Sequence, residues 1–342
     1  RVHGFPDSMT RDYLVFVSRV VFAIQVSMCL IVSSFAYASE PLVVDPLAQR
    51  YQLDHFVDFI PDRGWDFNEF LGHEAELDFA QSKDGALTFG YVNAAYWLRM
   101  TLINPAQNES RWVLEMSGLS RAVDQIQAYI PDQNGRYRLH KAGDSIPFSE
   151  RSVKHHSILF MVDLPAGQTR TIYLWVKTNG SLQIPMTLWS SEAYIQSEHH
   201  DSLLEGMFYG ILIIMLFYNG FIYWSVKDQS YLLYVCYLVC VLGFALSIKG
   251  VGFEYLWPER PAWNNKSNLI FSMMGVFFVL LFARSFLKTA IYTPRIHQAI
   301  GFLLISAVAC LAGVLELSHY HAASILGVQY GLSVIVVILA AS

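Results

Sequence analysis

The sequence has little charge, no cysteine outside its apolar runs, and no catalytic motif. Only 15% of its 342 residues are charged, whereas soluble proteins average about 25%. This deficit, with 54% hydrophobic residues, indicates a membrane protein. All the cysteines lie in apolar segments, so the polar part of the chain cannot form a disulfide and needs a hydrophobic core. They are Cys29, Cys236, Cys240 and Cys310.

The missing motifs exclude several kinds of chemistry. The sequence contains no phosphate-binding loop, no zinc-protease or serine-hydrolase motif, and no Cys/His zinc spacing. We therefore expect no enzymatic activity and no cofactor. The pairs His155-His156 and His199-His200 are adjacent, which in a strand or a helix turns the two rings to different faces. We expect exposed polar residues there and no metal site.

Charge is unevenly distributed along the polar part of the chain. Residues 39–201 carry thirteen Lys and Arg against twenty-one Asp and Glu, and eleven of these acids lie in residues 40–84. No basic stripe with interleaved aromatics is present, so we expect no nucleic-acid partner. The acids lack calcium-loop spacing, so a solvated acidic face is predicted.

The first 38 residues resemble an export signal. Arg11 and Arg19 precede an apolar run that ends in Ala36-Tyr37-Ala38, a small-x-small pattern typical of signal-peptidase sites. We expect cleavage after Ala38. The alternative is an uncleaved anchor, because residues 20–39 are long enough to span a bilayer of about 30 Å.

Residues 96–189 alternate with a period of two, which predicts β-strands. Leu98, Met100 and Leu102 alternate with Arg99 and Thr101, and two later segments repeat the pattern. Turn residues separate these runs at 104–105, 131–135 and 165–167. About seven or eight antiparallel strands in a β-sandwich are predicted, so residues 39–196 form an all-β domain.

Five long apolar runs then predict a transmembrane helical domain over residues 197–342. Export of the N-terminal domain places it in the periplasm and places Lys227 and the 284–295 loop in the cytoplasm. The positive-inside count favours this orientation only slightly. The predicted spans are 206–226, 229–248, 267–283, 296–315 and 317–342.

Two groups of side chains are candidate functional residues. Five on the exported domain offer aromatic faces and a cation to a sugar or a carboxylate, although such side chains also serve sheet packing. In the first span, small and polar residues predict helix packing, within one chain or in a homodimer. The first group is Trp97, Arg99, Tyr129, Tyr173 and Trp175, and the second is Gly206, Gly210 and Asn219.

These features together resemble a known family, the bacterial seven-transmembrane receptors with diverse intracellular signalling modules. Tyr96-Trp97-Leu98-Arg99 with Asn104, the 131–135 turn and Leu164-Pro165-Ala166-Gly167 are similar to its type 2 extracellular domain. The membrane half carries further matches in Tyr218-Asn219, Lys227-Asp228, Tyr231-Leu232-Leu233-Tyr234 and Leu256-Trp257-Pro258.

The resemblance implies a jelly-roll-like sandwich that binds a carbohydrate or a similar small ligand, and a seven-helix bundle that relays the signal to a cytoplasmic enzyme. Two further helices and an output domain such as a diguanylate cyclase or histidine kinase would then follow residue 342. We expect a signalling receptor in the bacterial inner membrane, with the lipid bilayer and a small periplasmic ligand as its partners. The alternative is a membrane-anchored carbohydrate-binding or adhesion protein.

Overall fold

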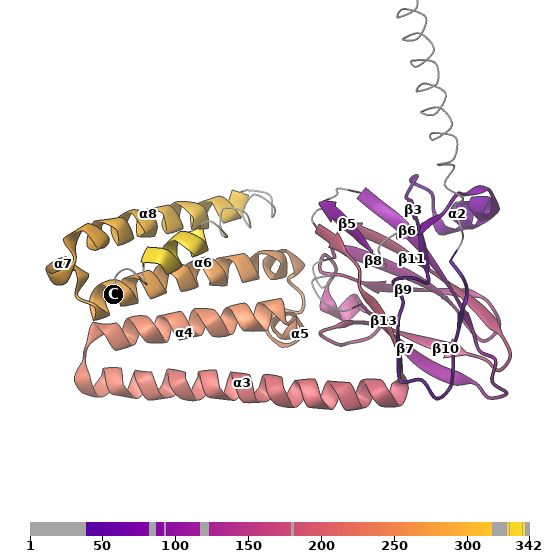
Figure 1. Ribbon diagram of the computed structural model, residues 1–342, viewed down its shortest axis with the longest axis horizontal. Coiled ribbons are helices and arrows are strands. Elements are labelled where there is room, and N and C mark those ends of the chain that lie inside the picture. The colour runs from indigo at the N-terminus through magenta and orange to yellow at the C-terminus, as the bar shows by residue number, and fades with distance from the viewer. Residues whose placement is uncertain are drawn as a thin grey trace, which may run out of the picture.

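The computed structural model describes residues 39–81, 87–91, 94–116, 123–178 and 181–316, and also 327, 329–336 and 338. The predicted signal peptide lies outside these residues, as does most of the predicted fifth span. The described chain forms a β-sandwich followed by a row of long helices that extend from one end of it (Figure 1).

The larger sheet of the sandwich has seven strands. Its order is β4-β3-β6-β11-β8-β9, and β1 pairs with β6 in the parallel direction while the other pairings are antiparallel. The strands are β1 (Leu42–Val43), β3 (Val57–Pro61), β4 (Ala80–Gln81), β6 (Ala94–Ile103), β8 (Gln125–Pro131), β9 (Tyr137–Ala142) and β11 (Thr169–Thr178).

A four-stranded antiparallel sheet forms the second layer, in the order β10-β7-β13-β2. A short two-stranded sheet pairs β12 with β5. The sequence pattern, which began at residue 96, missed the first five strands because most of them are too short to show a period. The strands of these two sheets are β2 (Arg50–Gln52), β5 (Thr88–Tyr91), β7 (Ser110–Met116), β10 (Ile158–Leu164), β12 (Ser181–Gln183) and β13 (Met186–Ser190).

The core between the two large sheets follows the predicted alternation. Leu98 and Met100 of β6, Leu114 of β7 and Leu174 of β11 are at most 1% exposed and belong to one cluster. The intervening residues of β6 and β11 point to the outer face of the larger sheet, where the short helix α2 (Phe67–His73) covers several of them. The predicted sandwich is confirmed. No helix was predicted at the position of α2.

The sandwich is followed by a bundle of long helices. The structure contains four helices long and apolar enough to cross a membrane, among the residues it describes. α4 packs between α3 and α6, and α8 packs on α6. The long helices are α3 (Ser191–Val226), α4 (Gln229–Ile248), α6 (Pro261–Phe286) and α8 (Pro294–Glu316), and the short ones are α5 (Val251–Tyr255) and α7 (Thr289–Tyr292).

The ends of the helices agree with the predicted orientation. The α4–α6 connection, which contains α5, lies beside the sandwich, whereas the α3–α4 turn and α7 lie at the far end of the bundle (Figure 1). Lys227 caps the C-terminal end of α3 at this turn. Outward-facing side chains such as Phe217, Phe221 and Trp224 are more than 70% exposed. In water these side chains would be a liability, but in a bilayer they contact lipid tails.

α3 begins earlier than the predicted first span. Ser190 closes β13 and also caps α3, its hydroxyl accepting a hydrogen bond from the Ala193 N–H at 3.3 Å. With 36 residues, the helix is about 54 Å long. It therefore runs without a break from the last strand of the sandwich into the membrane. The apolar part of the pattern marked only the portion that enters lipid.

We expect residues 39–196 to fold alone and without sensitivity to reducing agents, because their core is complete and contains no cysteine. Leu114→Ala should lower the free energy of unfolding of this domain by about 3 kcal/mol, since the side chain is fully buried. Leu139→Ala is the matched control, because Leu139 is 46% exposed. Urea melts followed by circular dichroism measure both, and a helical spectrum or equal losses would contradict the sandwich.

Candidate functional site

The strand register brings the five predicted ligand-binding residues together on the outer face of the larger sheet. Tyr173 of β11 lies opposite Arg99 of β6 on one side and Tyr129 of β8 on the other. Trp175 lies opposite Trp97. Residues separated by up to 78 positions in the sequence thus form one contiguous aromatic face, hereafter the aromatic face.

Helix α2 lies over the aromatic face. The Phe70 ring stacks on Trp97 with centroids 4.2 Å apart, and Phe67 stacks on Tyr129 at 3.8 Å with an angle of 7° between the rings. Trp97 and Tyr173 are at most 3% exposed, while Tyr129 and Trp175 keep partial access to solvent. The phenyl ring of Phe67 therefore covers one face of the Tyr129 ring.

Asp66 fixes the start of α2. Its carboxylate accepts hydrogen bonds from the N–H groups of Asn68 and Glu69, at 2.8 and 2.9 Å, and the Glu69 carboxylate accepts the Asp66 N–H at 3.3 Å. This reciprocal arrangement is a capping box. The Asp-x-x-Glu spacing at 66–69 is the sequence signal that could have predicted the helix.

A second acid orients the two tryptophans of the aromatic face. Asp62 accepts the indole N–H of Trp97 at one carboxylate oxygen and that of Trp175 at the other, both at 3.0 Å. Each indole then has a satisfied polar edge and presents its apolar surface to neighbouring side chains.

Arg99 is held by two carboxylates. Its guanidinium lies 2.8 Å from Asp58 and 2.9 Å from Glu74, and it also sits over the Phe79 ring, 4.0 Å from the centroid. Burial alone would lower the pKa of Arg99, but the hydrogen bonds to Asp58 and Glu74 outweigh it and raise the pKa. Arg99 therefore stays charged, and both of its terminal nitrogens donate to protein carboxylates.

Glu74 also reaches the aromatic face. Burial, together with a hydrogen bond to Glu74, raises the pKa of Tyr173 far above its ordinary value. The phenol is thus a permanent hydrogen-bond donor at physiological pH.

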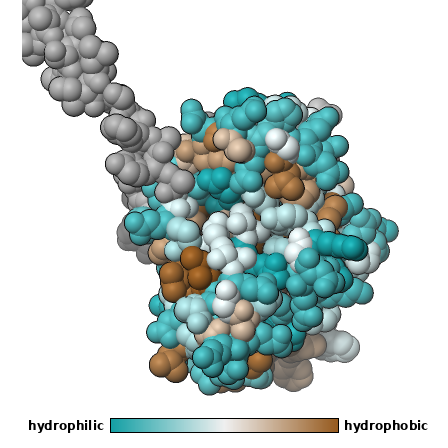
Figure 2. Space-filling model, turned by 90° about the vertical axis from the view of Figure 1, so that its right-hand side faces the viewer, coloured by the Kyte–Doolittle hydropathy of each residue, from teal (hydrophilic) through white to brown (hydrophobic). Residues whose placement is uncertain are grey.

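The acids of residues 40–84 match the expected solvated acidic face only in part. Several have specific partners, whereas the exposed ones are Glu40, Asp45, Asp66, Glu69, Glu76 and Asp78. Of the acids in residues 40–84, Asp58 is 2% exposed and paired, Asp62 binds two indoles, Asp66 caps α2, and Glu74 holds Arg99. They serve to attach α2 and its flanking loops to the sheet. The end of the sandwich that faces away from the bundle is mostly hydrophilic, and its apolar residues lie in separate groups (Figure 2).

The predicted packing residues of the first span lie on α3. A methyl group added at Gly206 or Gly210 would meet no described atom within 4 Å. The Asn219 amide donates to the Met215 carbonyl of its own helix at 2.8 Å. The packing role of all three residues stays a prediction.

The loop after β9 connects the sandwich to the bundle through α5. The Phe148 N–H donates to the Pro258 carbonyl at 2.8 Å, and the Ser149 hydroxyl donates to Glu259 at 3.2 Å. The rings of Phe148 and Phe253 meet edge to face at 5.8 Å. No local pattern in the sequence predicted this junction, because its two sides are about 100 residues apart.

A buried arginine stands at the centre of this junction. Arg151 is 6% exposed, and its guanidinium lies 5.1 Å from the ring centroids of both Phe148 and Phe253. Burial lowers the pKa of Arg151, and the nearby charges of Asp144 and Glu254 oppose that effect. A cation between two rings and two carboxylates ties the loop to α5.

Gly250 allows the close approach at the same junction. Its φ of +76° is in the left-handed region, and a Cβ atom there would lie 2.9 Å from the carbonyl oxygen of His156. Any larger residue would push the sandwich loop away from the start of α5.

Adjacent histidines in this loop depart from expectation. His155 and His156 lie in a bend before β10, outside any strand or helix, so the alternation of faces does not apply. Their rings lie side by side, with centroids 4.1 Å apart.

We expect Arg99→Ala to destabilise the sandwich by about 3 kcal/mol, because it leaves the buried Asp58 carboxylate without its partner. Arg111→Ala is the control, since the Arg111–Asp163 pair is at least half exposed and such pairs contribute little. Chemical denaturation of the isolated domain measures both. Equal effects of the two substitutions would contradict a structural role for Arg99.

The comparisons with known families agree with this architecture. Residues 52–190 match the family described as 7TMR-DISM extracellular 2, and residues 201–342 match 7TM diverse intracellular signalling. No curated protein matches the chain. An extracellular domain followed by membrane helices gives a multi-pass inner-membrane protein whose N-terminal domain is periplasmic. The two matches adjoin and cover most of the sequence, and the chain belongs to the family of seven-transmembrane receptors with diverse intracellular signalling modules.

Proposed function

We propose that this transmembrane signalling receptor senses a small periplasmic ligand, such as a carbohydrate, at the aromatic face, and relays its binding through the α5 junction to a cytoplasmic output. The observation that supports this most directly is the stacking of Phe67 on Tyr129 at 3.8 Å. Flat apolar faces of sugars stack on aromatic rings in the same way, so α2 acts as a cover that a ligand displaces.

The polar groups around the aromatic face suit a hydroxylated ligand. The Tyr129 hydroxyl donates to Gln127 at 2.9 Å, and Asp62 and Glu74 lie at the two ends of the face. Aromatic surface with a few oriented polar groups is typical of small-molecule sites. A ligand that moves α2 would also disturb the hold of Glu74 on Arg99.

The junction offers a route for the signal. β8 and β9 are neighbours in the larger sheet, and β9 leads directly into the loop that carries Phe148 and Arg151. Since this loop is hydrogen bonded to the α5–α6 connection, a shift of the sheet biases the position of α6. For the ligand to change the bundle, the receptor must have two conformations that bind the ligand with different affinities.

We expect a thermal-shift screen of residues 39–196 against sugars, amino acids and peptidoglycan fragments to find a stabilising ligand. At about 100 times its dissociation constant, a ligand adds about 2.7 kcal/mol. Tyr129→Ala should abolish the shift, whereas Phe67→Ala should raise the affinity by freeing the aromatic face. A shift that both variants leave unchanged would place the ligand elsewhere and refute this site.

We expect Phe253→Ala in the full chain to preserve ligand binding but to uncouple it from the bundle. Hydrogen exchange of residues 251–260 in nanodiscs, with and without the ligand found in the screen, reports the coupling. In the unsubstituted protein the ligand should change exchange there. Tyr255→Ala is the control, because Tyr255 is on the same helix but 72% exposed. Ligand-dependent exchange that survives Phe253→Ala would argue against this route.

A further inference from the structure

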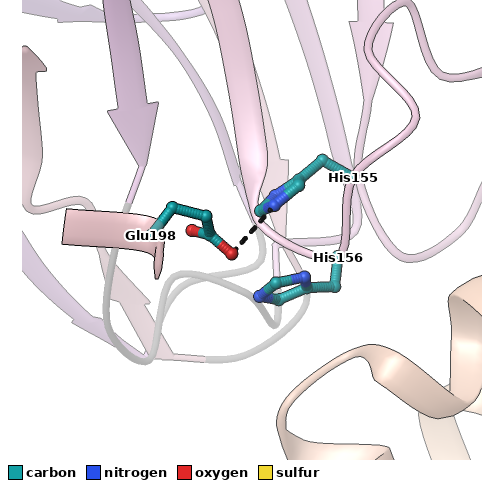
Figure 3. Close-up of side chains that lie close together, drawn as sticks. All are labelled: His155, His156 and Glu198. Carbon is teal, nitrogen blue, oxygen red and sulfur yellow. Dashed lines mark hydrogen bonds and ion pairs between the residues drawn. The ribbon is translucent and has the colours of Figure 1, made fainter. Parts of the chain in front are cut away.

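Three side chains of types that can bind metal ions meet where the sandwich joins the first membrane helix. His155 and His156 come from the loop before β10, and Glu198 comes from the second turn of α3 (Figure 3). One potential ligand atom from each of the three lies within 4.8 Å of the others. His155 Nε2 and Glu198 Oε1 are 3.3 Å apart. Two ligands of a tetrahedral Zn²⁺, each about 2.0–2.1 Å from the metal, have about the same separation.

A carboxylate behind His156 completes the arrangement. His156 Nδ1 lies 3.8 Å from Glu254 Oε2 of α5. Metal-binding histidines commonly direct their second nitrogen to a carboxylate, which fixes the ring and makes it a better ligand. The four side chains are 16–30% exposed, so an ion can reach them from solvent.

The surroundings attract cations. A cavity of about 280 Å³ adjoins the three residues and is lined by His156 and Glu198 themselves. Its other acidic lining residues are Glu115, Asp201 and Glu205, the last of which pairs with Lys249 at 2.6 Å. Negative charge in a concave site raises the local concentration of cations. The cavity also leaves room for a water molecule as a fourth ligand.

We propose that His155, His156 and Glu198 form a binding site for a divalent transition metal such as Zn²⁺, which clamps the sandwich to α3. Glu198 lies eight residues before Gly206, about 12 Å along the helix from the apolar part of the span. A bound metal fixes the angle between the periplasmic domain and the helix that enters the membrane. This inference does not depend on the aromatic face, because the metal site stands on different residues.

Binding has a defined proton balance. The Ser157 N–H donates to His155 Nδ1 at 3.0 Å, so the neutral ring carries its proton on Nε2 and donates it to Glu198. A metal takes the Nε2 lone pair, and the proton moves to Nδ1. The hydrogen bond from the Ser157 N–H to His155 Nδ1 is lost in the process.

The test is titration of the full chain in detergent micelles with Co²⁺, followed by competition with Zn²⁺. We expect one Co²⁺ per chain, with visible absorption bands of a tetrahedral or five-coordinate site and none of the intense near-ultraviolet absorption of cobalt–thiolate bonds. That absence would distinguish this site from Cys236 and Cys240. His155→Gln, His156→Gln and Glu198→Gln should each weaken binding by more than about 100-fold, and Glu254→Gln by about 10- to 100-fold.

His199→Gln and His200→Gln are the matched controls, because these histidines follow Glu198 on the same helix and are exposed. They should leave the affinity unchanged, and circular dichroism should show that every variant is folded. Absence of Co²⁺ binding, thiolate-type absorption, or equal losses in the controls and the three site variants would each overturn the proposal.

Discussion

The arrangement of this receptor depends on one continuous helix that passes from water into lipid. α3 satisfies its backbone hydrogen bonds internally, so it needs no change of conformation where the solvent changes. Its cap, Ser190, is also the last residue of β13. The sandwich therefore has no flexible linker at this point, and any tilt of the last strand acts directly on the first membrane helix.

The sandwich is attached to the bundle at a second place, in addition to α3. The loop that contains Phe148 and Arg151 packs against α5, which lies between the second and third membrane helices. Gly250 allows the backbone before α5 to approach the backbone of this loop at His156. Two attachments on different helices restrict rotation about either one. The larger sheet is thus attached near α6 and the smaller sheet to α3, with α4 packed between the two helices.

The outer face of the larger sheet carries a second, smaller aromatic core. Its aromatic side chains are satisfied by α2 in the present arrangement, through Phe67 and Phe70. The acids nearby hold this cover in place by capping and ion pairing. Because α2 has only seven residues, it would not be stable alone, and its conformation depends on these contacts with the sheet.

Much of the architecture was predictable because solvent imposes periods on the sequence. Alternation at Leu98, Met100 and Leu102 predicted the buried face of β6, and long uncharged runs predicted four spans.

The contacts between distant segments were not predictable in this way. The aromatic residues were visible in the sequence, but their grouping required the pairing of β11 with both β6 and β8, which no local period encodes. Likewise α2 over the sheet, Arg99 between Asp58 and Glu74, and the meeting of His155 and His156 with Glu198 arise from contacts between distant segments. Which residues avoid water can be read from the order of the amino acids, because hydrophobicity is a local property. The pairing of polar groups followed from the fold, because it depends on the register of the strands and on where α3 and α5 meet the sandwich.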